Sequence, residues 1–209
     1  MTNMDKLYEA VEARGPVCVG LDTDFSYLPA DFVDSTLTRG ENIVRFNQKL
    51  IDATKAVAGC YKVQIAYYES LGLEGMKAYA DTLKAVREAG VPVIADIKRG
   101  DIAKTAEMYA MGHFTGDFEA DFVTLAPYMG LDSISPYLPY AEKQGKGLFV
   151  LCRTSNGGAK DYEGIAAQAA FVLLLQSDED PGRKGISYLS ISRNSASILS
   201  VSSGARICR

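Results

Sequence analysis

The sequence predicts an α/β fold of the (β/α)8 TIM barrel type, of which strands one to five are recognisable. Short apolar runs alternate with longer amphipathic stretches at intervals of roughly thirty residues, the pattern of βα units around a parallel sheet. A doubly wound sheet fits the same alternation. However, no GxGxxG follows the first apolar run, which disfavours a dinucleotide-binding sheet. Polar residues also gather at several predicted strand ends, as in barrel enzymes.

Helix and strand signals can be placed in order along the chain. The first helix is expected over residues 4–14, capped by Asn3 and ended by Gly15. Apolar residues at helical spacing predict further helices over residues 41–58, 73–89, 102–114 and 131–144. Apolar runs predict buried strands over residues 16–21, 60–66, 91–95, 121–125 and 147–152.

The composition is that of a globular protein, with 47% hydrophobic and 23% charged residues. A net charge of -4 argues against a nucleic-acid-binding surface. No basic amphipathic run indicates a membrane face, and no apolar run nears the roughly 18 residues of a spanning helix. The first fifteen residues have the pattern of a charged amphipathic helix and not of a signal peptide, so we expect a cytoplasmic protein.

The cysteines and the single histidine predict no metal or disulfide framework. Cys18, Cys60, Cys152 and Cys208 form no CxxC pair, and three of them lie in apolar, strand-like runs. We therefore expect buried thiols in a reducing compartment. His113 lies in a helical stretch and is expected to be a surface or packing residue, which disfavours a histidine-centred triad or metal site.

An Asp-x-Lys-x-x-Asp motif follows the third apolar run and consists of Asp96, Lys98 and Asp101. Residues two apart on a strand point to the same side, so Asp96 and Lys98 are expected on one face with Ile97 turned away. A neighbouring carboxylate keeps an ammonium group charged. Asp101 lies near a helix start, where a carboxylate suits the helix dipole. A structural ion pair at a strand end is the alternative interpretation.

Four segments together resemble the orotidine 5'-phosphate decarboxylase family, and especially its longer bacterial subgroup. They are GLD at 20–22, YKVQ at 61–64, DIKRGDI at 96–102 with Thr105, and LCRTSN at 151–156. The resemblance covers roughly residues 4–165. It implies a barrel homodimer that needs no cofactor or metal. It also implies decarboxylation of orotidine monophosphate to uridine monophosphate, the last step of pyrimidine nucleotide synthesis.

The resemblance implies catalytic roles for four residues. Lys98 matches the lysine that protonates carbon 6 as the carboxylate leaves. Asp96 matches the carboxylate set against the substrate carboxylate. Lys62 and Asp101 complete an alternating charge network, with Asp101 crossing to the other subunit's site. Fixed ammonium groups suit this chemistry because they stabilise the negative charge that develops at carbon 6.

The resemblance also implies substrate-binding residues. Asp22 and Thr105 match ribose contacts, and Ser155 matches the residue that reads the pyrimidine edge. Ile102 and Thr154 lie in the matching segments and are expected to contact the substrate.

The sequence changes character after residue 165. From Ser177 it is rich in serine, and after Asp180 it contains basic but no acidic residues. The family's strands six to eight, with their phosphate-binding loops, are not recognisable there. We expect a barrel portion over residues 1–165 and a divergent Ser-rich basic tail over 166–209. A shifted reading frame is our hypothesis for the tail, which the coding DNA would test.

Two other functions stay open. A magnesium-dependent sugar-phosphate decarboxylase or aldolase of the same superfamily shares Asp-x-Lys-x-x-Asp, but it carries an acidic metal ligand where this chain has Lys62. The second alternative, suggested by the divergent tail, is a truncated, inactive relative that at most binds or dimerises.

Overall fold

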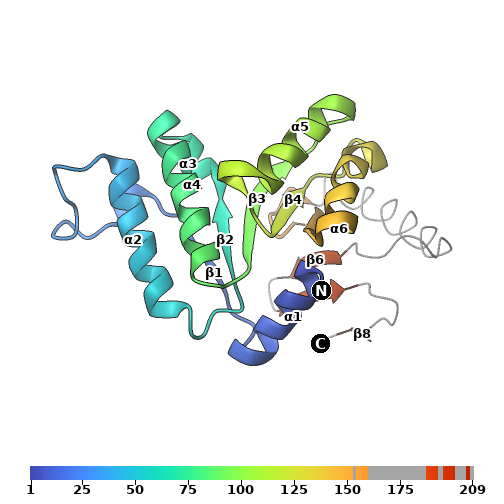
Figure 1. Cartoon of the computed structure of the whole chain (residues 1–209), viewed down its shortest axis with the longest axis horizontal. Helices are drawn as coiled ribbons and strands as arrows, with labels where there is room; N and C mark the ends of the chain where they lie inside the picture. The colour runs from blue at the N-terminus through green and yellow to red at the C-terminus, as the bar shows by residue number, and fades with distance from the viewer. Residues whose placement is uncertain (153, 160–186, 193–194, 201–205, 208–209) are drawn as a thin grey trace. The chain divides into compact units, whose positions relative to one another are not determined.

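The computed structural model describes residues 1–152, 154–159, 187–192, 195–200 and 206–207 (Figure 1). They fall into two compact units. The first comprises Met1–Ile97 and Met111–Val123, and the second comprises Lys98–Ala110 and Thr124–Arg209. The predicted domain boundary at residue 165 and most of the predicted tail lie outside the described residues.

The first unit contains three parallel strands. In chain order its elements are α1 (Asn3–Arg14), β1 (Cys18–Gly20), η1 (Phe25–Tyr27), α2 (Arg39–Thr54), β2 (Cys60–Gln64), α3 (Ile65–Glu69), α4 (Gly72–Glu88), most of β3 (Val93–Arg99), the end of α5 (Ala103–Phe114), η2 (Gly116–Phe118) and the start of β4 (Phe122–Leu125). β1 pairs with β2, and β2 with β3. The βα alternation predicted from the sequence is confirmed here.

Aromatic side chains fill the core between these strands and their helices. Tyr61, Tyr68 and Tyr79 are fully buried, and the rings of Tyr68 and Tyr79 lie 5.5 Å apart. The Tyr61 hydroxyl donates to the carbonyl of Ile51 on α2 at 3.2 Å. Figure 1 shows α2, α3 and α4 side by side along these strands. Because odd-numbered residues of β2 face these helices, Cys60, Lys62 and Gln64 lie on the opposite face.

β1 was predicted to be buried, and this prediction is wrong. Cys18 and Gly20 are exposed, and Val19 is half-buried. Among the described residues β1 pairs only with β2, so one of its sides is an edge. The predicted burial of the cysteines is confirmed for Cys60 alone, since Cys152 is half-buried and Cys208 lies outside the described residues.

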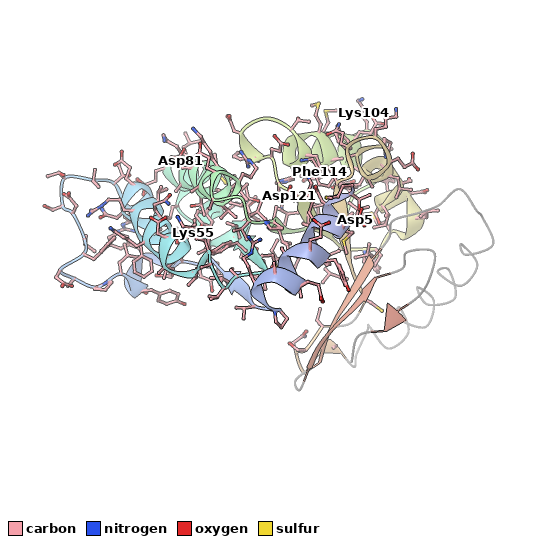
Figure 2. All side chains as sticks on the ribbon, turned by 60° about the horizontal axis from the view of Figure 1, so that its bottom comes forward. Asp5, Lys55, Asp81, Lys104, Phe114 and Asp121 are labelled. Carbon is pink, nitrogen blue, oxygen red and sulfur yellow. The ribbon has the colours of Figure 1, made fainter. Side chains whose placement is uncertain are left out.

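The first helix begins with a different cap from the one expected. The Thr2 hydroxyl accepts from the amide of Asp5 at 3.2 Å, and the Asp5 carboxylate accepts from the amide of Thr2 at 2.7 Å. This reciprocal pair is a capping box. Asn3 is instead buried, and its Nδ2 donates to the carbonyl of Asp121 at 3.1 Å. Asp5 and Asp121 are labelled in Figure 2.

The second unit begins with the last residues of β3 and the first part of α5. It continues with the end of β4 (Phe122–Leu125), η3 (Gly130–Ser133), η4 (Ser135–Tyr137), α6 (Leu138–Gln144), β5 (Gly147–Leu151), β6 (Ser187–Ser192), β7 (Ser195–Ser200) and β8 (Arg206–Ile207). The single helix predicted over 131–144 is divided into three short helices. Pro136 and Pro139 account for this, because proline lacks the amide proton of a helix interior.

Strands do occur where the sequence showed no recognisable sixth to eighth strand. β5 pairs with β6 in parallel, but β6 pairs with β7, and β7 with β8, in antiparallel orientation. The last two strands therefore do not continue the βα pattern, since βα units give parallel pairs.

His113 is a packing residue, as predicted. Its side chain is 5% exposed, and its ring centroid lies 6.3 Å from that of Phe118 within the first unit. Over the stretches that could be described, no helix is both long and apolar enough to cross a membrane.

Candidate active site

Three charged side chains meet in the first unit: Asp22, Lys62 and Asp96. The Lys62 Nζ lies 2.8 and 2.9 Å from the two carboxylate oxygens of Asp22, and 3.4 Å from Oδ2 of Asp96. Strand register explains the meeting, because β2 places Gln64 opposite Asp96 of β3, and Asp22 follows β1. Gln64 Nε2 donates to Asp96 Oδ2 at 2.9 Å.

Asp96 is the most buried member of this cluster. Its side chain is 8% exposed, compared with 29% for Lys62 and 37% for Asp22. Burial on its own would lower the pKa of Lys62, but the hydrogen bonds and charges of Asp22 and Asp96 outweigh it, so the pKa is raised. Lys62 is therefore an ammonium group at neutral pH. A buried carboxylate needs such a partner, since an isolated buried charge is very costly.

A buried hydrogen-bond network holds the backbone on both sides of Asp22. The Thr23 hydroxyl donates to Asn47 Oδ1 at 2.6 Å, and Asn47 Nδ2 donates to the Tyr68 hydroxyl at 2.8 Å. The Tyr68 hydroxyl in turn donates to the carbonyl of Leu21 at 3.0 Å. The network thus ties the strand end that carries Asp22 to α2 and α3. Sequence reasoning missed it, because its members share no motif.

Lys98 belongs to the second unit, where its side chain is exposed. Its backbone φ is 46°, a left-handed value that non-glycine residues adopt rarely and at some cost in strain. Its amide donates to the Thr124 hydroxyl at 2.9 Å. Side chains alternate between the two faces of a strand only where the backbone is extended, and the backbone of Lys98 is not extended. The expectation that Asp96 and Lys98 share a face stays a prediction.

The chain directly after Lys98 lies very close to the residue that follows β4. The amide of Ala126 donates to the carbonyl of Arg99 at 2.8 Å. A Cβ atom on Gly100 would lie 2.9 Å from the Ala126 carbonyl oxygen, so only glycine permits this approach. The Arg99 guanidinium lies 5.3 Å from the ring centroid of Tyr109. These contacts fix the position of the segment that leads to Asp101.

The remaining predicted site residues lie on two segments of the second unit. Asp101 is half-buried and its Oδ1 accepts from the amide of Ile102 at 2.8 Å, while Ile102 itself is 45% exposed. Thr105 is exposed in the first turn of α5. Thr154 and Ser155 follow β5, one half-buried and the other exposed.

The structure therefore brings together three of the predicted residues, Asp22, Lys62 and Asp96. Asp22 was expected as a ribose contact, and its ion pair with Lys62 was not foreseen. Gln64 and Thr124 were also missed as partners, although Gln64 lies two residues after Lys62 on the same strand face. Where the structure describes side chains, it contains no group of three or more His, Cys, Asp or Glu that could hold a metal ion.

Comparison with known proteins gives consistent matches. The model of the orotidine 5'-phosphate decarboxylase / HUMPS family matches residues 15–193. The chain is 60% identical over 165 residues to orotidine 5'-phosphate decarboxylase of Clostridium acetobutylicum, covering 79% of this chain and 58% of that protein. It is 59% identical over 163 residues to the protein of the same name from Clostridium perfringens, covering 78% and 57%. The chain thus spans a little over half the length of these relatives.

Solved structures give the same result. Leishmania donovani OMP decarboxylase matches with a TM-score of 0.64 and 38% identity, covering 77% of this chain and 57% of that one. A protein from Streptomyces avermitilis, described as a putative orotidine 5'-phosphate decarboxylase, matches with a TM-score of 0.74 and 30% identity, covering 88% and 66%. These likenesses confirm the barrel type of α/β fold predicted from the sequence.

Proposed function

Because the chain belongs to the orotidine 5'-phosphate decarboxylase / HUMPS family, we propose that it decarboxylates orotidine monophosphate to uridine monophosphate without a cofactor. One observation supports this most strongly: the Lys62 ammonium group on β2 is held between the carboxylate of Asp22, which follows β1, and that of Asp96 on β3. Asp22 lies just past the C-terminal end of β1, and barrel folds carry out their chemistry at that end of their strands.

The main requirement of the proposed reaction is a positive charge close to carbon 6. When the bond between carbon 6 and the carboxylate breaks, carbon dioxide leaves and the electron pair stays on carbon 6. An ammonium group that is already fixed in place stabilises this charge without reorganisation. The raised pKa of Lys62 keeps that residue charged throughout the neutral range.

In this proposal Lys98 donates the proton that carbon 6 receives, and its amine then regains a proton from water. Asp96 lies against the substrate carboxylate, and Asp101 completes the charge network from the partner subunit of a homodimer. Asp22, Ile102, Thr105, Thr154 and Ser155 are the proposed substrate contacts. The family membership supports these roles, together with a cytoplasmic place in pyrimidine synthesis.

The test is formation of uridine monophosphate by the purified chain, with Lys98→Ala and Lys104→Ala beside it. Lys104, which is labelled in Figure 2, is a matched control on the same segment. Its side chain is 77% exposed, and its Nζ lies 2.6 Å from a carboxylate oxygen of Glu107, three residues further along the helix. Lys98→Ala is expected to lower kcat by about 100-fold or more, the usual scale for losing a general acid. Lys104→Ala is expected to leave kcat unchanged.

Three results would contradict the proposal: no product from a folded sample, equal rates for the two variants, or a rate that depends on a divalent metal. A chelator is expected to have no effect. Loss of activity on chelation would favour the magnesium-dependent alternative.

A further inference from the structure

Two cysteines lie directly opposite each other on neighbouring strands of the first unit. Cys18 of β1 and Cys60 of β2 are register partners in a parallel pair. Neighbouring strands are about 4.8 Å apart, and register partners project to the same face. Disulfides form where Cα atoms are roughly 4.4–6.8 Å apart, so this spacing suits a cross-link.

The two thiols differ in their surroundings. Cys60 is 7% exposed, whereas Cys18 is exposed on the edge strand. The exposed Cys18 is therefore the thiol that a reagent in solution reaches first, and the buried Cys60 is its partner on the neighbouring strand.

The pair of cysteines lies two residues before the candidate active site on the same two strands. Two residues after Cys18 and Cys60, the next register partners on the same face are Gly20 and Lys62. A bond between the thiols would join the strand that leads to Asp22 to the strand that carries Lys62. The sequence predicted buried thiols, but the exposure of Cys18 makes it reachable by a reagent in solution.

We propose that Cys18 and Cys60 are a redox modification site, which a small disulfide oxidant such as oxidised glutathione converts reversibly into a disulfide. The Cys18 thiolate attacks one glutathione sulfur, the glutathione S–S bond breaks, and one glutathione thiolate leaves. Cys60 then loses its proton and attacks the Cys18 sulfur, which releases the second glutathione. Two electrons pass from the protein to the oxidant, and the two leaving thiolates take up the protons. This inference is independent of the proposed decarboxylation.

The test is treatment of the chain, in a Cys208→Ser background, with oxidised glutathione, followed by alkylation and mass spectrometry of intact protein and peptides. The expected product lacks two hydrogen atoms, has the Cys18 and Cys60 peptides joined, and returns to the starting mass with dithiothreitol. In Cys60→Ser the reaction is expected to stop after its first step, with a mixed disulfide between Cys18 and glutathione. Cys152→Ser, which removes a thiol of the other unit, is expected to behave like the parent.

A stable glutathione adduct on Cys18 in the parent chain would overturn the proposal, as would an unmodified Cys18 or a cross-link to Cys152. A second measurement needs no substitution at the pair. In the native parent chain, alkylation of Cys18 is expected to be much faster than alkylation of Cys60, because Cys18 is exposed and Cys60 is 7% exposed. Equal rates for the two thiols would also contradict the inference.

Discussion

Replacing Asn47 by leucine tests whether the buried network supports the site. Asn47 is 1% exposed and bonds the hydroxyls of Thr23 at 2.6 Å, Tyr68 at 2.8 Å and Thr82 at 3.1 Å. Tyr68 keeps its bond to the Leu21 carbonyl, but Thr23 is left as a buried donor without this acceptor. An unsatisfied buried group costs about 1–3 kcal/mol and a lost neutral hydrogen bond about 1 kcal/mol. We therefore expect the free energy of unfolding to fall by about 2–4 kcal/mol.

Urea unfolding followed by circular dichroism measures this change. Gln48→Leu is the matched control, because Gln48 is the next residue of α2 and is exposed. It is expected to change the unfolding free energy by less than about 0.5 kcal/mol. Adding Thr23→Val to Asn47→Leu is expected to recover part of the loss, since removing both partners leaves nothing unsatisfied. Equal stability of Asn47→Leu and Gln48→Leu would show that the bonds of Asn47 do not stabilise the fold.

Three further predictions concern Lys62 and two glycines. The folded pKa of Lys62 is raised, so its contribution to stability is complete below the ordinary lysine value of about 10.4 and is lost as pH rises through the higher folded value. In urea titrations the difference in unfolding free energy between the parent and Lys62→Met should therefore be constant near neutral pH and become smaller above about pH 10.4. A difference that becomes larger above that pH would contradict a raised pKa for Lys62. Gly100→Ala should lower Tm, because its Cβ would meet the Ala126 carbonyl. Gly112→Ala should raise stability by about 1 kcal/mol, since the added methyl group meets open space inside α5, and a fall in its Tm would count against this account.

The sequence predicted the features that depend on residues close together in the chain. Apolar periodicity placed α1, α2, α4 and the three strands of the first unit to within a few residues, because each element must bury one face or stripe. It did not predict the short helix α3, whose first two residues were assigned to the preceding strand. The Asp-x-Lys-x-x-Asp motif identified Asp96, and the resemblance to the family added Lys62 and Asp22, the other two residues that meet there. Neither predicted that Lys62 pairs with Asp22, forty positions earlier in the chain. Strand register sets such a contact, and a single sequence does not display register.

Other features depended on tertiary context in a similar way. The exposure of β1 follows from its place at an edge, although its residues are as apolar as those of a central strand. The left-handed backbone of Lys98 breaks an alternation that the sequence alone could only assume to continue. Thr2 and Asn3 are both good capping residues, and the bond from Asn3 to the Asp121 carbonyl decided between them.

The most direct test of the account is a turnover experiment in heavy water. The chain and orotidine monophosphate are mixed in D2O, and the product is analysed by NMR and mass spectrometry. We expect uridine monophosphate with one deuterium at carbon 6, formed by the parent chain and by Lys104→Ala but not at a comparable rate by Lys98→Ala. Unlabelled product, or labelled product formed equally fast by Lys98→Ala, would show that Lys98 is not the proton donor.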